Sequence, residues 1–331
     1  MLKIDTHAHW FPPEWVELIR TEGVKHGAKI LRHERGHELV QAPGVALKGN
    51  FLPTYVELSE RLKLMDAARV DMHALSLTSP MVYWAPPEFG LKLSQVYNDA
   101  CAAAHLKYPH RFVGMMMVPM QAPELAVQEI ERASKLPGIR GVYMATHVNG
   151  MNLDDESFFP VYAACEKHGM PIFLHPVSPV GTERMRKYHL GNFLGNPYET
   201  GIAAASLMFS GVMDKYPKLD VMLPHAGGTF PHLIGRMDHG TTVRAECKHM
   251  TQPPSSYLRR FHYDTITHSD SILLNLIRQV GADRVVMGSD CPADMSYTQP
   301  VQVIERMTDL TANEREAIVS GNAARLLGVS S

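Results

Sequence analysis

The stretch Ile4-Asp5-Thr6-His7-Ala8-His9-Trp10 places two histidines at positions i and i+2 of a short apolar run. Side chains with this spacing on a β-strand point to the same face, so His7 and His9 can converge on one point. Two neutral imidazoles that converge suit a divalent metal ion. The same pair is compatible with two ordinary surface or core histidines, so the rest of the chain has to decide between these interpretations.

The length and composition restrict the class of protein. The chain has 331 residues and a formal net charge of -2, which fits one large α/β barrel and, without basic runs, argues against nucleic acid as a partner. No apolar stretch approaches the length of a transmembrane helix, and a strand that begins within two residues of Met1 leaves no room for a signal peptide, so we expect no membrane association. The four cysteines show no pairing pattern and predict reduced thiols in a cytoplasmic protein.

Eight short apolar runs alternate with stretches of helical periodicity, which predicts a (β/α)8 TIM barrel. The predicted strands are 3–9, 72–78, 112–119, 139–145, 171–175, 220–225, 261–265 and 284–290. The predicted helices between them are 55–68, 91–106, 123–136, 155–168, 200–216 and 271–280. Runs this apolar suit strands that are covered on both faces.

Three stretches fall outside the bare barrel. Residues 11–52 follow the first strand, are rich in Gly, His and charge, and predict an inserted lid. Residues 176–197 form a second insert after the fifth strand. Beyond the eighth strand, three further helices are predicted at 297–307, 313–320 and 322–327. Without internal repeats or linkers, residues 1–331 are expected to form a single domain.

Three later strands end in groups that can bind a metal or transfer a proton. The fifth run ends Leu174-His175-Pro176, the sixth ends Pro224-His225-Ala226-Gly227-Gly228, and the eighth ends Ser289-Asp290-Cys291-Pro292. The carboxyl ends of barrel strands lie on one face, where active sites of this fold are built. We therefore expect His7, His9, His175, His225 and Asp290 to meet there.

The motifs DTHAH, FLHP, PHAGG and GSDCP, in this order, resemble the amidohydrolase superfamily. Weaker matches, such as Pro197-Tyr198-Glu199-Thr200, resemble its branch around 2-amino-3-carboxymuconate-6-semialdehyde decarboxylase and the hydroxybenzoate decarboxylases. The resemblance implies one divalent metal, most often zinc, held by His7, His9, His175 and Asp290. Three imidazoles with one carboxylate suit Zn²⁺ and are also acceptable to Mn²⁺ or Fe²⁺. The fourth strand ends without the lysine of binuclear members, which favours a single ion.

The resemblance also implies roles for the remaining polar residues. His225 would transfer the proton, with a purely structural histidine as the alternative, and Asp290 would be both ligand and possible proton donor to the substrate carbon. Arg236 would bind the substrate carboxylate from the partner subunit of a homodimer, or else form a salt bridge on a helix surface. Arg184 is a weaker candidate for carboxylate binding, with a solvated charge as its alternative.

The match departs from the branch near the expected substrate. Leu52 stands where the muconate-semialdehyde enzyme has an arginine, and Ala293 stands where it has an aromatic ring. These changes predict a different, less acidic or bulkier substrate, because losing a carboxylate partner costs affinity. The expected pocket is lined by apolar and aromatic side chains, namely Phe51, Leu52, Tyr83 and Trp84.

We expect an enzyme that decarboxylates an aromatic or ring-cleavage (muconate-like) carboxylic acid without oxidation. A hydrolase or hydratase of a lactone, an amide or a vinylogous C–C bond is the alternative on the same scaffold, since function depends on the site and not on the barrel. A non-catalytic metal-binding protein is a third class, for which a complete ligand set beside His225 has no evident use.

Overall fold

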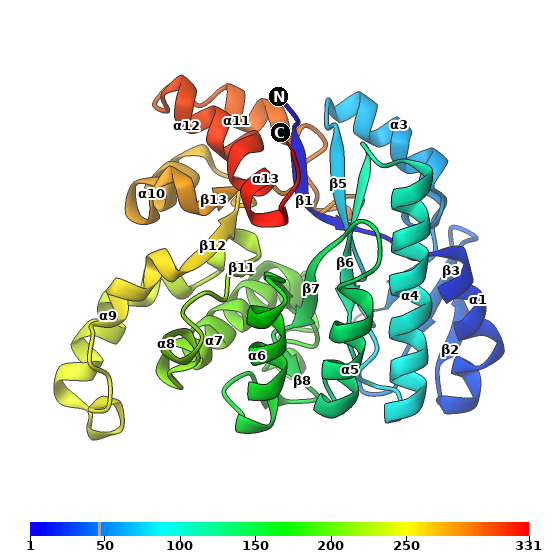
Figure 1. The fold of residues 1–331 in the computed structure, drawn as a ribbon, viewed down its shortest axis with the longest axis horizontal. Coiled ribbons are helices and arrows are strands. Elements are labelled where there is room, and N and C mark those ends of the chain that lie inside the picture. The colour runs from blue at the N-terminus through cyan, green and yellow to red at the C-terminus, as the bar shows by residue number, and fades with distance from the viewer. Residues whose placement is uncertain (46–47, 331) are drawn as a thin grey trace.

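The computed structural model describes residues 1–45 and 48–330, so residues 46 and 47 of the predicted insert and residue 331 lie outside the described part. Eight parallel strands form the barrel in the order β1-β5-β6-β7-β10-β11-β12-β13, as Figure 1 shows. Their bounds are Ile4–His9, Met72–Ser76, Phe112–Met117, Ile139–Ala145, Ile172–His175, Val221–Leu223, Phe261–Asp264 and Val285–Val286. The predicted (β/α)8 barrel is confirmed.

The barrel closes where the first strand meets the last. The amide of Thr6 donates to the carbonyl of Met287 at 2.9 Å, the amide of Asp290 to the carbonyl of His7 at 2.9 Å, and the amide of His9 to the carbonyl of Cys291 at 2.7 Å. A parallel bridge between Ala8 and Cys291 continues this pairing beyond β13. The segments that carry three of the four predicted metal ligands are therefore hydrogen-bonded to each other.

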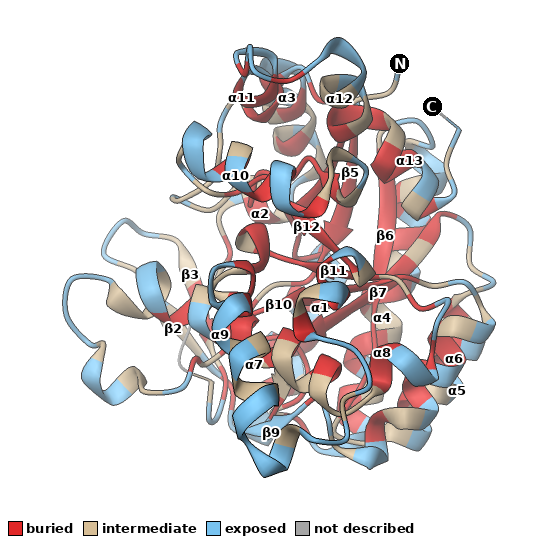
Figure 2. Cartoon of the chain, turned by 90° about the vertical axis from the view of Figure 1, so that its left-hand side faces the viewer, coloured by how far each residue is buried: buried red, intermediate tan, exposed pale blue. Residues whose placement is uncertain are grey.

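Helices cover the outer face of the strands, which are almost entirely buried (Figure 2). They are α4 (Pro87–Lys107), α5 (Pro123–Ala133), α6 (Phe159–Lys167), α7 (Asn196–Phe209), α8 (Val212–Lys215), α9 (Phe230–Val243) and α10 (Asp270–Val280). In α10 the buried side chains are Leu273, Leu276, Ile277 and Val280, the spacing of one apolar helix face. None of the helices in residues 1–45 and 48–330 is long and apolar enough to cross a membrane.

Several predicted helices change their bounds for local reasons. The helix predicted at 91–106 begins earlier, at Pro87, because a proline favours the first turn of a helix. The stretch 55–68 divides into α2 (Pro53–Val56) and α3 (Leu58–Ala68), with Glu57 extended between them. The stretch 200–216 divides at Gly211, which has a φ of 76°. The sequence did not predict α9, in which only Phe230, Pro231 and Ile234 are buried, so it lacks a strong apolar stripe.

The 11–52 insert folds into a helix and a small sheet. Helix α1 (Pro13–Thr21) is followed by the antiparallel strands β2 (Lys29–Arg32), β3 (Glu38–Gln41) and β4 (Gly49–Asn50). Trp15 and Ile19 of α1 join the hydrophobic core. A side chain at Gly49 would stand 2.8 Å from the carbonyl oxygen of Ser79, so the glycine lets β4 return close to the segment after β5.

The remaining elements lie at the two ends of the barrel. A short hairpin of β8 (His147–Val148) and β9 (Met151–Asn152) follows β7. Helices α11 (Pro300–Glu305), α12 (Ala312–Glu316) and α13 (Asn322–Leu327) follow the last strand. The side chain of Asn322 donates to the carbonyl oxygens of Ala282 and Val285, both at 2.7 Å, which fixes α13 against β13.

Candidate metal centre

The four predicted ligand residues come together at the carboxyl ends of β1, β10 and β13. His7, His9, His175 and Asp290 are all buried, and each offers one ligand atom within 4.8 Å of the others. Residues 283 positions apart in sequence thus share one point because parallel barrel strands end on the same face. The cluster is the strongest candidate for a metal site in the described part of the chain.

A register irregularity of the β-bulge kind lies in β1 next to the two histidines. The pairing of β1 with β5 shifts register between Asp5 and Ala8, and such a bulge redirects side chains locally. Before the bulge, Asp5 lines a separate cavity together with Ala67 and Ala68 of α3. The ring of His7, which lies within the irregular span, is 4.9 Å from the ring of His9, which follows it, and both are at the cluster.

Asp264, the last residue of β12, fixes the orientation of His7. Nδ1 of His7 lies 2.8 Å from Oδ2 of Asp264, so the ring donates there and its Nε2 lone pair faces the cluster. The same carboxylate accepts the backbone N–H groups of His225 at 3.0 Å, Ala226 at 2.8 Å and Ile266 at 3.0 Å. Nε2 of His7 is buried and has no hydrogen-bond partner among the described residues, as expected of an atom that binds an ion.

His9 and Asp290 face each other across the cluster. Nδ1 of His9 lies 3.1 Å from the hydroxyl of Ser76, and Nε2 lies 2.8 Å from Oδ1 of Asp290. Asp290 has a φ of 67°, a left-handed conformation that is uncommon outside glycine and concentrates at functional sites. Its backbone hydrogen bond to His7 holds it in that conformation.

The ionisation of the cluster suits a cation. Burial lowers the pKa of His9 to about 4 and holds that of His175 well below its ordinary value. Burial opposes ionisation of Asp290, but the hydrogen bond from His9 and the neighbouring imidazoles hold its pKa below the usual range. For His7, burial is outweighed by the hydrogen bond to Asp264 and by nearby carboxylates, which raise its pKa. A carboxylate and two neutral imidazoles already have the form in which ligands bind metal.

The donor set fits one divalent ion. Three imidazole nitrogens and one carboxylate oxygen suit Zn²⁺ or Mn²⁺ better than Ca²⁺, which prefers oxygen ligands. At the end of β7, where a second ion would need a further ligand, the ring of Tyr143 stacks on His175 with centroids 5.8 Å apart, and Ala145 ends the strand.

His225 lies beside the ligands without being one of the four. Its ring centroid is 5.5 Å from that of His7 and 5.9 Å from that of His175. His225 and Ala226 both have positive φ values, 52° and 56°, and Asp264 accepts both of their backbone N–H groups. Burial and the neighbouring His7 lower the pKa of His225. This places an imidazole that is neutral at pH 7 next to the cluster, in a backbone conformation that Asp264 maintains.

A cavity of about 230 Å³ opens on the cluster and has His225 and Asp290 in its wall. No Lys or Arg is among its described lining residues, whose polar members include Asn192, Asn196, His232, Thr267 and His268. Pockets for drug-sized ligands span roughly 300–1,000 Å³, so this cavity, hereafter the metal-side cavity, suits a single small ring.

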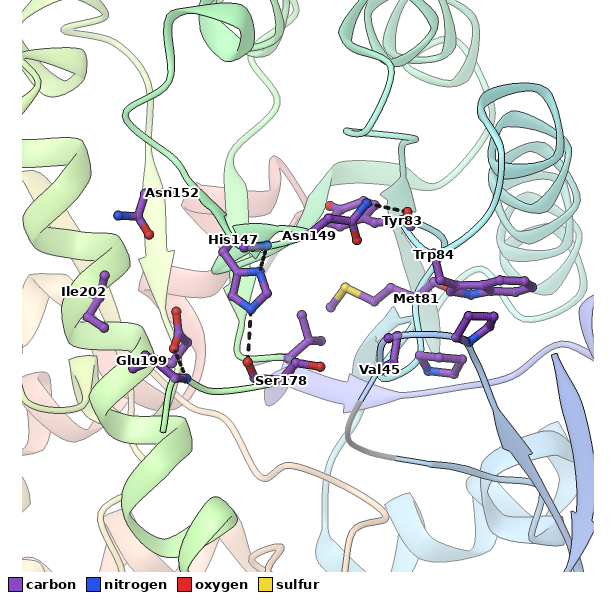
Figure 3. A pocket seen from close by; sticks show the side chains of 16 residues that line it. Val45, Met81, Tyr83, Trp84, His147, Asn149, Asn152, Ser178, Glu199 and Ile202 are labelled. Atoms are coloured by element: carbon purple, nitrogen blue, oxygen red, sulfur yellow. Dashed lines mark hydrogen bonds between the residues drawn. The ribbon is translucent and has the colours of Figure 1, made fainter. Parts of the chain in front are cut away.

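A larger cavity of about 820 Å³ lies on the same face but is not lined by the four ligands. Tyr83 and Trp84, two predicted substrate contacts, line it (Figure 3). The hydroxyl of Tyr83 accepts the amide of Ala145 at 3.3 Å, and Nε1 of Trp84 donates to the carbonyl of Met81 at 3.1 Å. Both rings are thus fixed next to the loops after β5 and β7, away from the metal-side cavity.

The other predicted substrate contacts are not among the described lining residues of the metal-side cavity. Phe51 is buried against Phe11, with ring centroids 5.3 Å apart, and Leu52 precedes the first turn of α2. Arg184 and Arg236 are exposed, and neither forms a salt bridge with a described residue. Within one chain, neither arginine lines the metal-side cavity.

Sequence reasoning missed two buried residues that support the ligands. Asp264 has the same signal as the ligands, a polar residue at the end of an apolar strand. Arg61 is fully buried, donates to the carbonyl of His9, and donates to the carbonyl of Thr54 at 3.0 Å. The sequence pattern that could have indicated its burial is a charged residue on the apolar stripe of a predicted helix, between Leu58 and Leu62.

Comparison with known proteins places these features in a family. An amidohydrolase family model matches residues 4–329. The chain is 33% identical to a 2-amino-3-carboxymuconate-6-semialdehyde decarboxylase of Dictyostelium discoideum, over 99% of this chain and 92% of that protein. It is 31% identical to a gamma-resorcylate decarboxylase of Polaromonas sp., over 80% and 86% of the two chains. A dihydroxybenzoic acid decarboxylase from Polaromonas sp. JS666, solved with manganese and the inhibitor 2-nitroresorcinol, superposes with a TM-score of 0.80 at 26% identity over 99% and 97% of the chains.

Proposed function

This chain belongs to the amidohydrolase family, and from that membership we propose that it is a metal-dependent, non-oxidative decarboxylase of a small aromatic or ring-cleavage carboxylic acid. The observation that carries the proposal is the buried cluster of His7, His9, His175 and Asp290 with His225 beside it. A chain 33% identical over nearly its whole length to a named decarboxylase supports the same reaction class.

His7, His9, His175 and Asp290 would hold one divalent ion. We propose Zn²⁺ because of the borderline-soft, nitrogen-rich donor set; the manganese in a related decarboxylase makes Mn²⁺ the second choice. A bound cation would supply electrostatic stabilisation of negative charge on the substrate. Asp264 and Ser76 orient His7 and His9 for this role.

His225 is the proposed proton donor. Its Nδ1 is enclosed and has no partner among the described residues, which leaves Nε2 as the ring nitrogen available to a molecule in the metal-side cavity. Nε2 would first take up a proton from a hydroxyl of the substrate or from solvent, and that proton would then add to the substrate carbon that carries the carboxylate, which returns His225 to its neutral form. The bond between that carbon and the carboxyl carbon then breaks, its electron pair stays with the ring, and CO₂ leaves. Because the pKa of Asp290 is held low, we assign this proton to His225 and a ligand role to Asp290.

We further propose that the chain acts as a homodimer in which Arg236 of one subunit reaches the substrate of the other. In support, Arg236 is exposed on α9, which projects from the barrel (Figure 1), and the metal-side cavity has no described guanidinium of its own. Mixing Arg236→Ala and His225→Asn chains tests the arrangement, because a mixed dimer would contain one intact site. Activity should return on mixing; a monomer in sedimentation, or no recovery on mixing, would contradict it.

A reducing, cytoplasmic setting is proposed from the cysteines. Cys101, Cys165, Cys247 and Cys291 are all free thiols, as is usual in reducing compartments.

The proposed reaction is tested by reconstituting the protein separately with Zn²⁺ and Mn²⁺. Each form is given hydroxybenzoates, aminobenzoates, muconate semialdehydes and lactones, while CO₂ and ultraviolet absorbance are recorded together. CO₂ released in step with the absorbance change is the expected result. An absorbance change without CO₂ would instead assign the chain to the hydrolases or hydratases.

A further inference from the structure

The metal-side cavity contains a buried side-chain amide without a hydrogen-bond partner. Asn196 is 5% exposed and lines the cavity together with His225 and Asp290. Its Oδ1 is enclosed without a partner, and none of the described residues hydrogen-bonds to its Nδ2, which is not enclosed and is therefore the amide atom open to the cavity. The one hydrogen bond at this residue that involves a side chain runs from the hydroxyl of Thr200 to its backbone carbonyl, at 3.1 Å. Buried amides are nearly always paired, so this one calls for a partner that the protein does not supply.

The backbone around Asn196 is fixed in place next to His225. The amide of Thr229, in the turn after His225, donates to the carbonyl of Pro197 at 3.1 Å. A side chain at Gly228 would stand 2.0 Å from that same carbonyl oxygen, so the glycine permits the close contact. The first residues of α7 are thus held against the turn that carries the proposed proton donor. These backbone contacts fix the position of Asn196 in the cavity wall.

The surroundings of Asn196 restrict what it can bind. Neither Lys nor Arg lines the described wall of the cavity, so a second carboxylate would find no cation there. The amide nitrogen of Asn196 donates hydrogen bonds, which matches a neutral oxygen that accepts them. A hydroxyl on a small ring meets both requirements, while the reacting carboxylate stays on the side of the metal ligands.

We propose that Asn196 is a specificity-determining residue that hydrogen-bonds a ring hydroxyl of the substrate. This inference rests on the proposed function for the position of the carboxylate and adds the substituent that the site selects. The amide distinguishes a hydroxylated ring from its deoxy counterpart, because the counterpart would leave the buried amide unpaired. A site built to bond a hydroxyl discriminates against the molecule that lacks it.

Binding measured by calorimetry on the metal-loaded protein tests the proposal without depending on turnover. Salicylate is compared with 2,3-, 2,4- and 2,5-dihydroxybenzoate, so that each pair gives the effect of one added hydroxyl. In the wild type, a hydroxyl added at one of the three ring positions should lower the Kd roughly three- to tenfold, which is the typical net effect of a neutral hydrogen bond. In Asn196→Leu, which replaces the amide by an apolar group of similar shape, that gain should disappear while salicylate binding changes little.

Two matched variants separate hydrogen bonding from cavity shape. Ile272→Ala removes apolar volume from the same wall and should change the affinities of both members of each pair by the same factor. Asn196→Asp keeps an acceptor but adds a charge, and should weaken all of these anions. Metal content and circular dichroism of each variant establish that it is folded and loaded.

Each outcome decides the proposal. An equal hydroxyl effect in wild type and Asn196→Leu would overturn it, as would a wild type that binds none of these acids or gains nothing from any added hydroxyl. Loss of the hydroxyl effect in Asn196→Leu supports it even if no acid releases CO₂. In that case the proposed reaction fails while the proposed role of Asn196 stands.

Discussion

The two sides of the metal cluster differ in how their polar groups are satisfied. On the barrel side, formed by β1, β5, β12 and β13, the carboxylate of Asp264 accepts three backbone amides and the ring of His7. Asp5 accepts the amides of His7 and Ser289, each at 3.0 Å, and the hydroxyl of Ser289. On the cavity side, formed by the start of α7 and the turn at His225, the side-chain amide of Asn196 has no described partner.

This difference separates two tasks. Saturated hydrogen bonding holds ligands in one orientation, which a metal site needs before the ion arrives. Unpaired buried groups cost free energy in the empty site, and a substrate that pairs with them recovers it. We interpret the barrel side as the part that fixes the ion and the cavity side as the part that selects and protonates the substrate. The following changes test that division, from the largest expected effect to the smallest.

Replacing a metal-ligating residue should abolish both metal binding and turnover. His175→Ala removes one of four donors, so we expect substoichiometric metal by elemental analysis and turnover reduced by roughly four orders of magnitude or more, because the variant loses the cation's electrostatic stabilisation. His110→Ala changes an exposed histidine and should keep metal and activity. Full metal occupancy with wild-type turnover in His175→Ala would remove this residue from the site.

Replacing the proposed proton donor should lower turnover without lowering metal content. His225→Asn should lower turnover about 10²- to 10⁴-fold, the usual contribution of general acid–base catalysis, while metal content stays at one ion per chain. Asparagine tolerates the positive φ at this position, so the turn should be kept. Unchanged turnover on a true substrate would exclude His225 from the proton transfer, and loss of metal would give it a role on the barrel side.

Weakening the hydrogen bonds on the barrel side should reduce metal affinity more than it reduces turnover at saturating metal. Asp264→Asn exchanges the carboxylate that orients His7 for an amide, and we expect metal affinity to fall about 10- to 100-fold. Competition with a chelator measures this affinity. At saturating metal, turnover should recover only in part, because Asp264 also accepts the backbone N–H groups of His225 and Ala226. Wild-type affinity in this variant would mean that the contact from Asp264 to His7 does not support the ion.

The raised pKa of His7 predicts how metal binding depends on pH. Below its folded-state pKa, which lies above the ordinary value of 6.5, His7 carries a proton that the ion must displace. Apparent affinity should therefore fall as pH falls through that pKa, by up to about tenfold per unit for one proton. His9, with a pKa of about 4, contributes only at lower pH. Calorimetry in two buffers of different ionisation enthalpy should detect proton release near pH 6.5, and a pH-independent affinity between pH 6 and 8 would contradict the prediction.

The smallest effect is expected in the 176–197 insert. Arg184 is exposed and has no described ion-pair partner. Arg184→Ala should therefore change the free energy of unfolding by no more than about 0.5 kcal/mol and kcat/KM by no more than about twofold. Thermal unfolding and steady-state kinetics check both quantities. A large rise in KM would instead place Arg184 at the substrate when the site is occupied.

The barrel and the ligand cluster were accessible from sequence because both depend on short local signals. Each strand is an apolar run, and His7, His9, His175 and Asp290 stand where such runs end. Asp264 had the same signal but only in a short, polar strand, so it was overlooked. Asn196 could not be found in this way, because its importance comes from burial and a missing partner, which depend on tertiary packing. Arg61 gave only the weaker signal of a charged residue on an apolar helix stripe. The small sheet in the 11–52 insert and α9 were missed because their apolar patterns are too weak.

The closure of the barrel has a consequence for how the protein is made. The backbone bonds between the residues around His7 and those around Asp290 join segments more than 280 positions apart. At roughly 5–20 residues per second, a ribosome needs about 15 to 60 s to pass from the first ligand to the last. During that interval His7 and His9 exist without Asp290, on a first strand that lacks one neighbour. Metal capture by the full ligand set therefore follows synthesis of nearly the whole chain, and a cell that makes this protein has to keep the exposed edge of β1 from pairing wrongly until β13 arrives.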